Sequence, residues 1–282
     1  MSLQDILLHL DTYPEPTPDA AIDAAVGLAA RLGGQLTALA LRLSIPVRSN
    51  ILAERLIGLT DLAREEEARS LAACNHVLER FKKRAEDTGV FRGTLLETAG
   101  LPDFALHVAR KARARDLCIV PISAALDGQK EVAETVIFNS GRPVLLMRSE
   151  IPAAPKLTDG VAVVAWDGGV PAARAMADAL PILRGMRRVR VLTILNEKAS
   201  AVGGLAQDAA RHLQTHGIET AIDYVETDGH GIGETLDGYL GETRPDLLVM
   251  GAYGHSRLRE MVLGGATEHM LRHAQVPVLL SH

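Results

Sequence analysis

The sequence is poor in cysteine, in aromatic residues and in surplus positive charge, and each shortage excludes a class of protein. Two cysteines, Cys74 and Cys118, among 282 residues cannot form the disulfide framework of a small secreted protein. Aromatic residues make up 3% of the chain and hydrophobic residues 47%, so the chain can bury a core and that core is aliphatic. Lys and Arg number 30 against 35 Asp and Glu, which argues against nucleic-acid binding through a basic surface.

Long hydrophobic runs and targeting signals are absent as well. No stretch reaches the roughly 18 apolar residues that a membrane-spanning helix needs. The first residues, Met-Ser-Leu-Gln-Asp-Ile-Leu-Leu, lack the basic region and the cleavable apolar stretch of a secretory signal. We therefore expect a globular, cytoplasmic protein that does not associate with membranes.

Short aliphatic runs in the chain alternate with longer segments of helical period. This alternation is typical of an α/β protein with a parallel sheet. Strands are predicted over 5–10, 35–43, 91–98, 116–121 and 143–147, and again over 160–166, 188–196, 219–226, 246–250 and 276–280. Helices are predicted over 19–32, 53–88, 103–115 and 129–138, and again over 171–183, 203–216, 232–242 and 263–274.

The two sets of elements have the same order, which indicates an internal duplication. Asp116-Leu-Cys-Ile-Val-Pro121 parallels Asp246-Leu-Leu-Val-Met-Gly251, and Pro143-Val-Leu-Leu146 parallels Pro277-Val-Leu-Leu280. These anchors are 27 residues apart in the first copy and 31 in the second, so the first copy is four residues shorter after its fourth strand. The predicted architecture is two tandem five-stranded parallel-sheet domains, 1–150 and 156–282, joined by a short linker that contains two prolines.

Common catalytic motifs are missing from the sequence. It contains no G-x-x-x-x-G-K-[ST], no G-x-S-x-G, no H-E-x-x-H and no C-x-x-C. The stretch Gly229-His-Gly-Ile-Gly233 is similar to a dinucleotide-binding turn, but its third glycine comes one residue early and it follows a third strand. A flexible strand-to-helix turn explains this stretch better.

Two histidines on the last predicted helix could share a metal ion. His269 and His273 are four residues apart, which places them on one helix face. A clear third ligand is missing, although Glu268 is adjacent. Polar positions of an amphipathic helix explain the pair more simply, and we predict no metal site and no catalytic residue.

The most informative segment is Gly251-Ala-Tyr-Gly254, followed by nine residues and then Gly264-Gly265-Ala-Thr267. It follows a buried strand and leads into a helix. Paired glycines allow sharp turns and bring backbone N–H groups close to a ligand. The start of the next helix offers unpaired N–H groups and the positive end of its dipole. The sequence therefore predicts an anion-binding loop at the carboxyl edge of a parallel sheet.

This glycine spacing resembles the nucleotide-binding loop of the universal stress protein family. The residues that follow, from Glu268 to Leu280, are similar to that family's closing helix and strand. The resemblance covers both halves, so the chain looks like a tandem universal stress protein. It implies a Rossmann-like α/β fold in which the two domains associate through their last strands as a pseudo-two-fold pair within one chain.

The resemblance also implies a set of binding residues in the second domain. Asp167, which ends the run Val163-Val-Ala-Trp-Asp167, matches the family's aspartate beside the adenosine, and Ile194 matches a position whose backbone contacts adenine. A carboxylate can accept hydrogen bonds from adenine or ribose, and backbone N–H groups can hold phosphates. The positions that match the phosphate loop are Gly251, Gly254, Gly264, Gly265 and Ala266.

Two departures from the family pattern affect this expectation. Gly265 stands where ATP-binding members usually carry serine or threonine, so a hydroxyl contact to phosphate is lost. That contact is worth roughly 0.5–1.5 kcal/mol, or up to about 3 kcal/mol with a charged phosphate. Pro121 takes the place of Gly251 in the first domain and removes a backbone N–H group. We therefore predict that the first domain binds no nucleotide, although Asp11 is kept there.

The resemblance implies a cytoplasmic stress-response protein that binds an adenine nucleotide, ATP, ADP or AMP, in its second domain, and it leaves open whether Mg²⁺ accompanies the nucleotide. The implied role is regulatory and not catalytic. Two alternatives stay open: a nucleotide-free scaffold in which both sites have decayed, and a slow ATPase that uses the same cleft. The implied partners are the nucleotide and unidentified proteins, and a homodimer of whole chains stays open beside the pairing within one chain.

Overall fold

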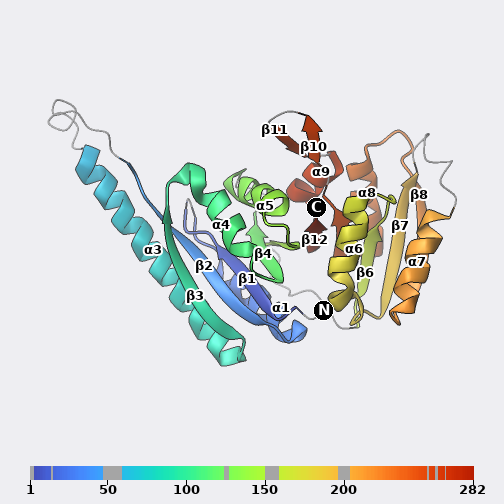
Figure 1. The fold of residues 1–282 in the computed structure, drawn as a ribbon, viewed down its shortest axis with the longest axis horizontal. Coiled ribbons are helices and arrows are strands. Elements are labelled where there is room, and N and C mark those ends of the chain that lie inside the picture. Colours follow the sequence, from blue (N-terminus) through green and yellow to red (C-terminus); the bar gives the residue numbers. More distant parts are fainter. Residues whose placement is uncertain are drawn as a thin grey trace.

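The structure is a computed structural model. It describes residues 3–13, 15–46, 59–123, 127–149, 159–195, 204–252, 254–257, 260–263 and 265–282. Ten strands form one sheet in the order β3-β2-β1-β4-β5-β12-β9-β6-β7-β8, and a separate hairpin, β10-β11, stands beside it (Figure 1).

Within its described residues, the N-terminal half supplies five strands and four α-helices. The strands are β1 (Asp5–Leu10), β2 (Gln35–Leu43), β3 (Phe91–Ala99), β4 (Leu117–Ile122) and β5 (Val144–Arg148). The helices are α1 (Asp19–Leu32), α3 (Leu59–Thr88), α4 (Phe104–Ala112) and α5 (Asp127–Asn139), with a short 3-10 turn at Leu101–Asp103.

The C-terminal half repeats this order and adds the hairpin. Its strands in the main sheet are β6 (Val161–Ala165), β7 (Arg188–Leu195), β8 (Thr220–Glu226), β9 (Leu247–Gly251) and β12 (Val278–Ser281). Its helices are α6 (Val170–Leu183), α7 (Leu205–Thr215), α8 (Ile232–Thr243) and α9 (Gly265–His273), and the hairpin consists of β10 (Gly254–Arg257) and β11 (Glu260–Leu263).

Helices cover both faces of the sheet, which explains the continuous aliphatic runs of its central strands. Alternate residues of each strand point to opposite faces: on β1, Ile6 and Leu8 pack on one side and Leu7 on the other. Helices α1, α3, α6 and α7 pack on the first face, and α4, α5, α8 and α9 on the second. The two aliphatic cores therefore lie on the two sides of one sheet.

Within each half the strands are parallel, and the order of the chain reverses at the first strand. In the C-terminal half β6 pairs with β7 on one side and with β9 on the other. The segments that follow β6 and β9 therefore leave the sheet in different directions. A crevice opens at the carboxyl ends of such strands, and this is where ligands of open α/β sheets bind.

The two halves are joined edge to edge by an antiparallel pair, β5 with β12. Val278 lies opposite Leu146, and Leu280 opposite Val144. Each of these strands would otherwise expose a row of unpaired backbone groups. Their pairing turns two five-stranded sheets into one ten-stranded sheet.

The predicted fold class, two tandem parallel α/β units paired through their last strands, is confirmed. One local prediction was wrong: residues 255–263 were expected to form a loop, and the structure places the β10-β11 hairpin there. Residues 53–58 of the predicted long helix lie outside the described residues, and the domain limits 1–150 and 156–282 stay a prediction. None of the helices in the described ranges is long and apolar enough to cross a membrane.

Candidate functional site

A pocket of about 170 Å³ lies at the carboxyl edge of the sheet in the C-terminal half, where the order of the strands reverses. Strands β6, β7 and β9 form its floor, and the beginnings of α6, α8 and α9 form its walls. The residues that line it are Ala165, Trp166, Asp167, Ala172, Leu192, Ile194, Ile232, Leu236, Met250, Gly251 and Ala266.

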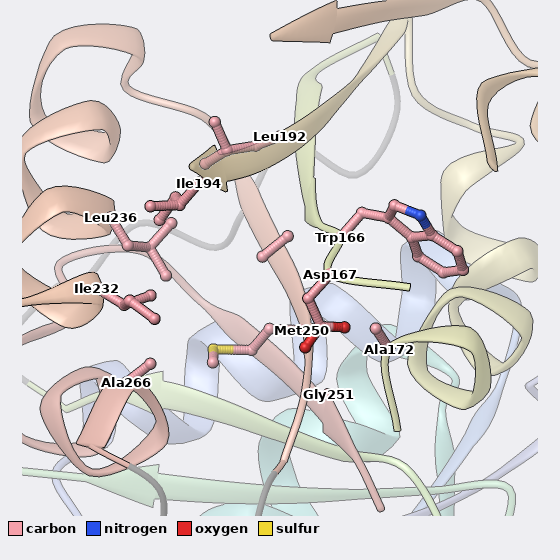
Figure 2. A pocket seen from close by; sticks show the side chains of 11 residues that line it. Trp166, Asp167, Ala172, Leu192, Ile194, Ile232, Leu236, Met250, Gly251 and Ala266 are labelled. Atoms are coloured by element: carbon pink, nitrogen blue, oxygen red, sulfur yellow. The ribbon is translucent and has the colours of Figure 1, made fainter. Parts of the chain in front are cut away.

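Four of the seven residues predicted to bind nucleotide line this pocket. They come from distant parts of the sequence, and they are Asp167, Ile194, Gly251 and Ala266. Gly265 is the first residue of α9, directly before Ala266, and Gly254 begins β10 three residues after Gly251. Gly264 lies outside the described residues. Figure 2 shows Asp167 across the pocket from Ile194 and the α8 side chains.

Asp167 follows the last strand residue of β6 by two positions, and its side chain is exposed to solvent. Its Oδ1 accepts a hydrogen bond from the backbone N–H of Gly169 at 2.8 Å, which closes the turn into α6. Gly168, in the middle of this turn, has a φ of +76°, a conformation that favours glycine. The turn therefore fixes the carboxylate at the pocket wall, and Asp167 has a structural role besides any contact with a ligand.

Trp166, the single tryptophan of the chain, anchors the same segment. Its Nε1–H donates to the backbone oxygen of Leu205 at 3.1 Å, and its own backbone oxygen accepts from the Thr193 hydroxyl at 3.0 Å. In Figure 2 its ring points away from the side chains of α8. These two bonds tie the end of β6 to β7 and to the start of α7.

Gly251 is required by the packing of the protein and not only by a ligand. A Cβ atom at this position would lie 2.4 Å from the backbone nitrogen of Ala172 and 2.5 Å from the carbonyl carbon of Pro171. The end of β9 therefore touches the first turn of α6. Sequence reasoning assigned Gly251 to a phosphate loop, and the structure adds this separate reason for a glycine.

The start of α9 forms the remaining wall. Gly265 has open space around it: a Cβ atom there would meet nothing within 4 Å. The first N–H groups of a helix have no partner within it, and the positive end of the dipole lies at the same place. Thr267 is 1% exposed. Its side chain is therefore buried, two positions beyond Gly265.

The pocket combines apolar walls, one carboxylate and one helix N-terminus. Such a combination suits a small molecule that has a flat apolar part, hydroxyl or amine donors and an anionic group. Among the described residues that line the pocket, Asp167 is the sole ionisable one. Across the part of the chain that the structure describes, no three His, Cys, Asp or Glu side chains are placed to hold a metal ion. The rings of His269 and His273 lie 4.6 Å apart on α9.

Residues 161–282 match the sequence profile of the universal stress protein family. This half of the chain is similar to that family. A universal stress protein of Synechocystis is 34% identical over 84 residues, which are 30% of this chain and 28% of that protein. The chain thus spans less than a third of that relative's length.

Solved structures extend the comparison to the whole chain. A universal stress protein from Archaeoglobus fulgidus superposes with a TM-score of 0.72 at 16% identity, over 99% of this chain and 97% of that one. A protein of unknown function from Pseudomonas aeruginosa gives a TM-score of 0.55 at 16% identity, over 98% and 92% of the two chains. At this level of identity the likeness shows that both halves have the universal stress protein fold.

The first universal stress protein-like unit differs from the second at the position that corresponds to the pocket. His9 on β1 pairs with Leu39 of β2 as Ala165 on β6 pairs with Leu192 of β7. His9 is 2% exposed, and its Nε2 lies 2.9 Å from Oδ1 of Asp11. The first unit therefore has a buried imidazole where the second has the methyl group of Ala165, and this imidazole contacts the aspartate that corresponds to Asp167.

Sequence reasoning singled out one of these two differences between the units, Pro121, and missed the other, His9. Pro121 lies within β4, opposite Met147 of β5, where its missing N–H group was expected to matter. The sequence did contain a signal for His9, because Asp11 and Asp167 are 156 residues apart and the same offset aligns His9 with Ala165.

Proposed function

We propose that the C-terminal universal stress protein domain binds an adenine nucleotide in the pocket between β6, β7, β9 and α9, as a regulatory ligand that is not hydrolysed. The observation that carries this proposal is the convergence of Asp167, Ile194, Gly251 and Ala266 on one cavity, although they are up to 99 residues apart in the sequence.

Each part of the pocket suits one part of such a nucleotide. The aliphatic side chains of Ile194, Leu236 and Met250 offer a surface on which a flat base can be buried. The Asp167 carboxylate can accept hydrogen bonds from ribose hydroxyls or from an exocyclic amine. The first turn of α9, from Gly265, directs N–H groups and a positive dipole end toward phosphate.

A regulatory role is favoured over hydrolysis by the chemistry of the pocket. Phosphoryl transfer needs a group that positions water and positive charge that stabilises the transferred phosphate. Asp167 is the one ionisable side chain among the described residues that line the pocket, and it already serves the turn through Gly169. A bound nucleotide would instead bridge β6, β9 and α9 and stabilise their arrangement.

The test is a calorimetric titration of Mg-ATP into protein that has been stripped of bound small molecules, with Trp166 fluorescence as a second signal. We expect one site per chain. Asp167→Asn keeps an oxygen for the Gly169 N–H but removes the charge, and should weaken binding roughly 10- to 100-fold, as expected for loss of a charged hydrogen bond. The matched control is Asp11→Asn at the corresponding position of the first unit, which should leave the affinity unchanged.

Each result has a defined meaning. One site that Asp167→Asn weakens and Asp11→Asn does not supports the proposal. Two sites per chain would refute the expectation for the first unit. Absence of heat and of a fluorescence change with ATP, ADP and AMP would refute nucleotide binding and favour a scaffold.

A further inference from the structure

Helix α9 connects the pocket to the other half of the protein. Ala266, the second residue of α9, lines the pocket, and the carboxyl end of α9 accepts hydrogen bonds from Arg148 of β5 in the N-terminal half. In Figure 1 the helix sits close to β12, the strand that pairs with β5. Any group that fixes the end of this nine-residue helix also fixes its beginning, because a short helix moves as one body.

Arg148, the last residue of β5, binds the carboxyl end of α9. Its side chain is buried, at 8% exposure of the residue, and its Nε–H donates to the backbone oxygen of Ala274 at 3.0 Å. A second guanidinium nitrogen donates to the backbone oxygen of Arg272. The last carbonyls of a helix have no partner within it and carry the negative end of its dipole, so a buried cation at this end stabilises the helix.

A second contact ties the side of α9 to the N-terminal half. Lys130 on α5 donates to the Glu268 carboxylate on α9 at 3.0 Å, and Glu134 lies 3.5 Å from the same Lys130. The hydrogen bond and the charge of Lys130 hold the pKa of Glu268 below its usual value. Helix α9 is thus held at its end by β5 and along its side by α5.

The pseudo-symmetric position in the other half carries a different group. The offset of 134 residues between Pro143 and Pro277 aligns Arg148 with His282. The His282 ring packs edge-on against Phe138 of α5, with centroids 4.7 Å apart. The contact onto α5 is aromatic, whereas the contact onto α9 is a buried cation on backbone carbonyls, so a charged cap acts on the helix that lines the pocket.

We infer that Arg148 is a positioning residue for the nucleotide pocket: from the N-terminal half it holds α9 so that Gly265 and Ala266 stay at the pocket wall. The expected effect on nucleotide affinity rests on the proposed function, whereas the effect of Arg148 on α9 does not. The N-terminal half, which is expected to bind no nucleotide itself, thereby sets the affinity of the C-terminal pocket.

The test compares Arg148→Met with Arg142→Met. Arg142 likewise donates a guanidinium hydrogen bond to a backbone oxygen, that of Arg113 at 3.0 Å, and provides a control at an exposed position away from α9. In full-length protein without ligand, Arg148→Met should speed hydrogen exchange of the α9 amides roughly tenfold, while β6 and β9 stay protected. Arg142→Met should leave exchange in α9 unchanged.

Affinity for Mg-ATP is the second measurement. Arg148→Met should weaken it several-fold, and Arg148→Lys, which keeps the charge and one donor, should restore part of it. If Arg148→Met leaves exchange in α9 at the wild-type rate, the inference is overturned whatever the ligand does. Faster exchange with unchanged affinity would overturn the effect on the pocket. Wild-type protein that binds no nucleotide would refute the proposed function, and the exchange rates would still decide whether Arg148 holds α9. Should Arg148→Met not fold, Arg148→Lys decides by the same two measurements.

Discussion

Replacement of Gly251 by alanine should destabilise the protein through the contact between β9 and α6. The new Cβ would lie 2.4 Å from the backbone nitrogen of Ala172, whereas ordinary contacts begin at 3.4 Å. One of the two elements therefore has to move by about 1 Å, and its partner atoms are backbone, which cannot rotate away. Overpacking of this kind costs about 1–3 kcal/mol, which for a chain of this size lowers Tm by about 2–12 °C.

The matched control is Gly265→Ala. The added methyl group would meet nothing within 4 Å, and the residue lies at the start of a helix, so stability should stay the same or rise by up to about 1 kcal/mol. Urea and thermal unfolding, followed by circular dichroism, measure both variants. The close approach of β9 and α6 would be refuted if Gly251→Ala were as stable as the wild-type protein, or if Gly265→Ala lost as much stability as Gly251→Ala.

Three further predictions concern the pocket and its surroundings. Ala165→His places in the second unit the side chain that His9 provides in the first, and it should abolish nucleotide binding in a folded protein; binding that persists in a calorimetric titration would contradict this. Gly265→Ser adds a hydroxyl in open space at the start of α9 and should tighten nucleotide binding roughly 2- to 10-fold. A titration that shows equal or weaker affinity would count against a phosphate at the start of α9. Burial, and then a hydrogen bond to Asp223, raise the pKa of Tyr239 from its usual 10 to about 12. Because the folded protein favours the neutral phenol, about 3 kcal/mol of stability should be present below pH 10 and lost as the pH rises to 12. Tyr239→Phe should lose less stability over that pH range, as measured by urea unfolding. Equal losses in the two proteins would refute the raised pKa of Tyr239.

The order of strands and helices could be predicted because each buried strand is a short aliphatic run between amphipathic segments. Val161–Ala165 and Leu247–Gly251 are buried on both faces and stand out in the sequence for that reason. The hairpin of β10 and β11 could not be predicted in the same way. It lies outside the main sheet, and its first strand, Gly254–Arg257, shows none of the aliphatic character of the others.

Side-chain contacts with the backbone were the part of the site least accessible to prediction. Asp167 follows a recognisable strand, and it lies at the pocket where the resemblance placed it. Arg148 had no such signal, because its partners are carbonyl groups 124 and 126 residues away, and carbonyl groups are present at every position. The close approach at Gly251 was equally hidden, since it depends on where α6 begins relative to β9 and not on the residue types nearby.

The antiparallel seam between β5 and β12 has a consequence for how the two halves can vary. In a pair of identical subunits, every substitution appears twice, so a histidine that occupied one ligand site would occupy both. Because both sides of this seam belong to one polypeptide, His9 and Ala165 can differ while the sheet between them stays continuous. The same covalent connection fixes the ratio of the two kinds of unit at one to one. Each molecule therefore carries one unit with Ala165 at its pocket beside one with a buried histidine at the corresponding position, a composition that free exchange of subunits could not guarantee.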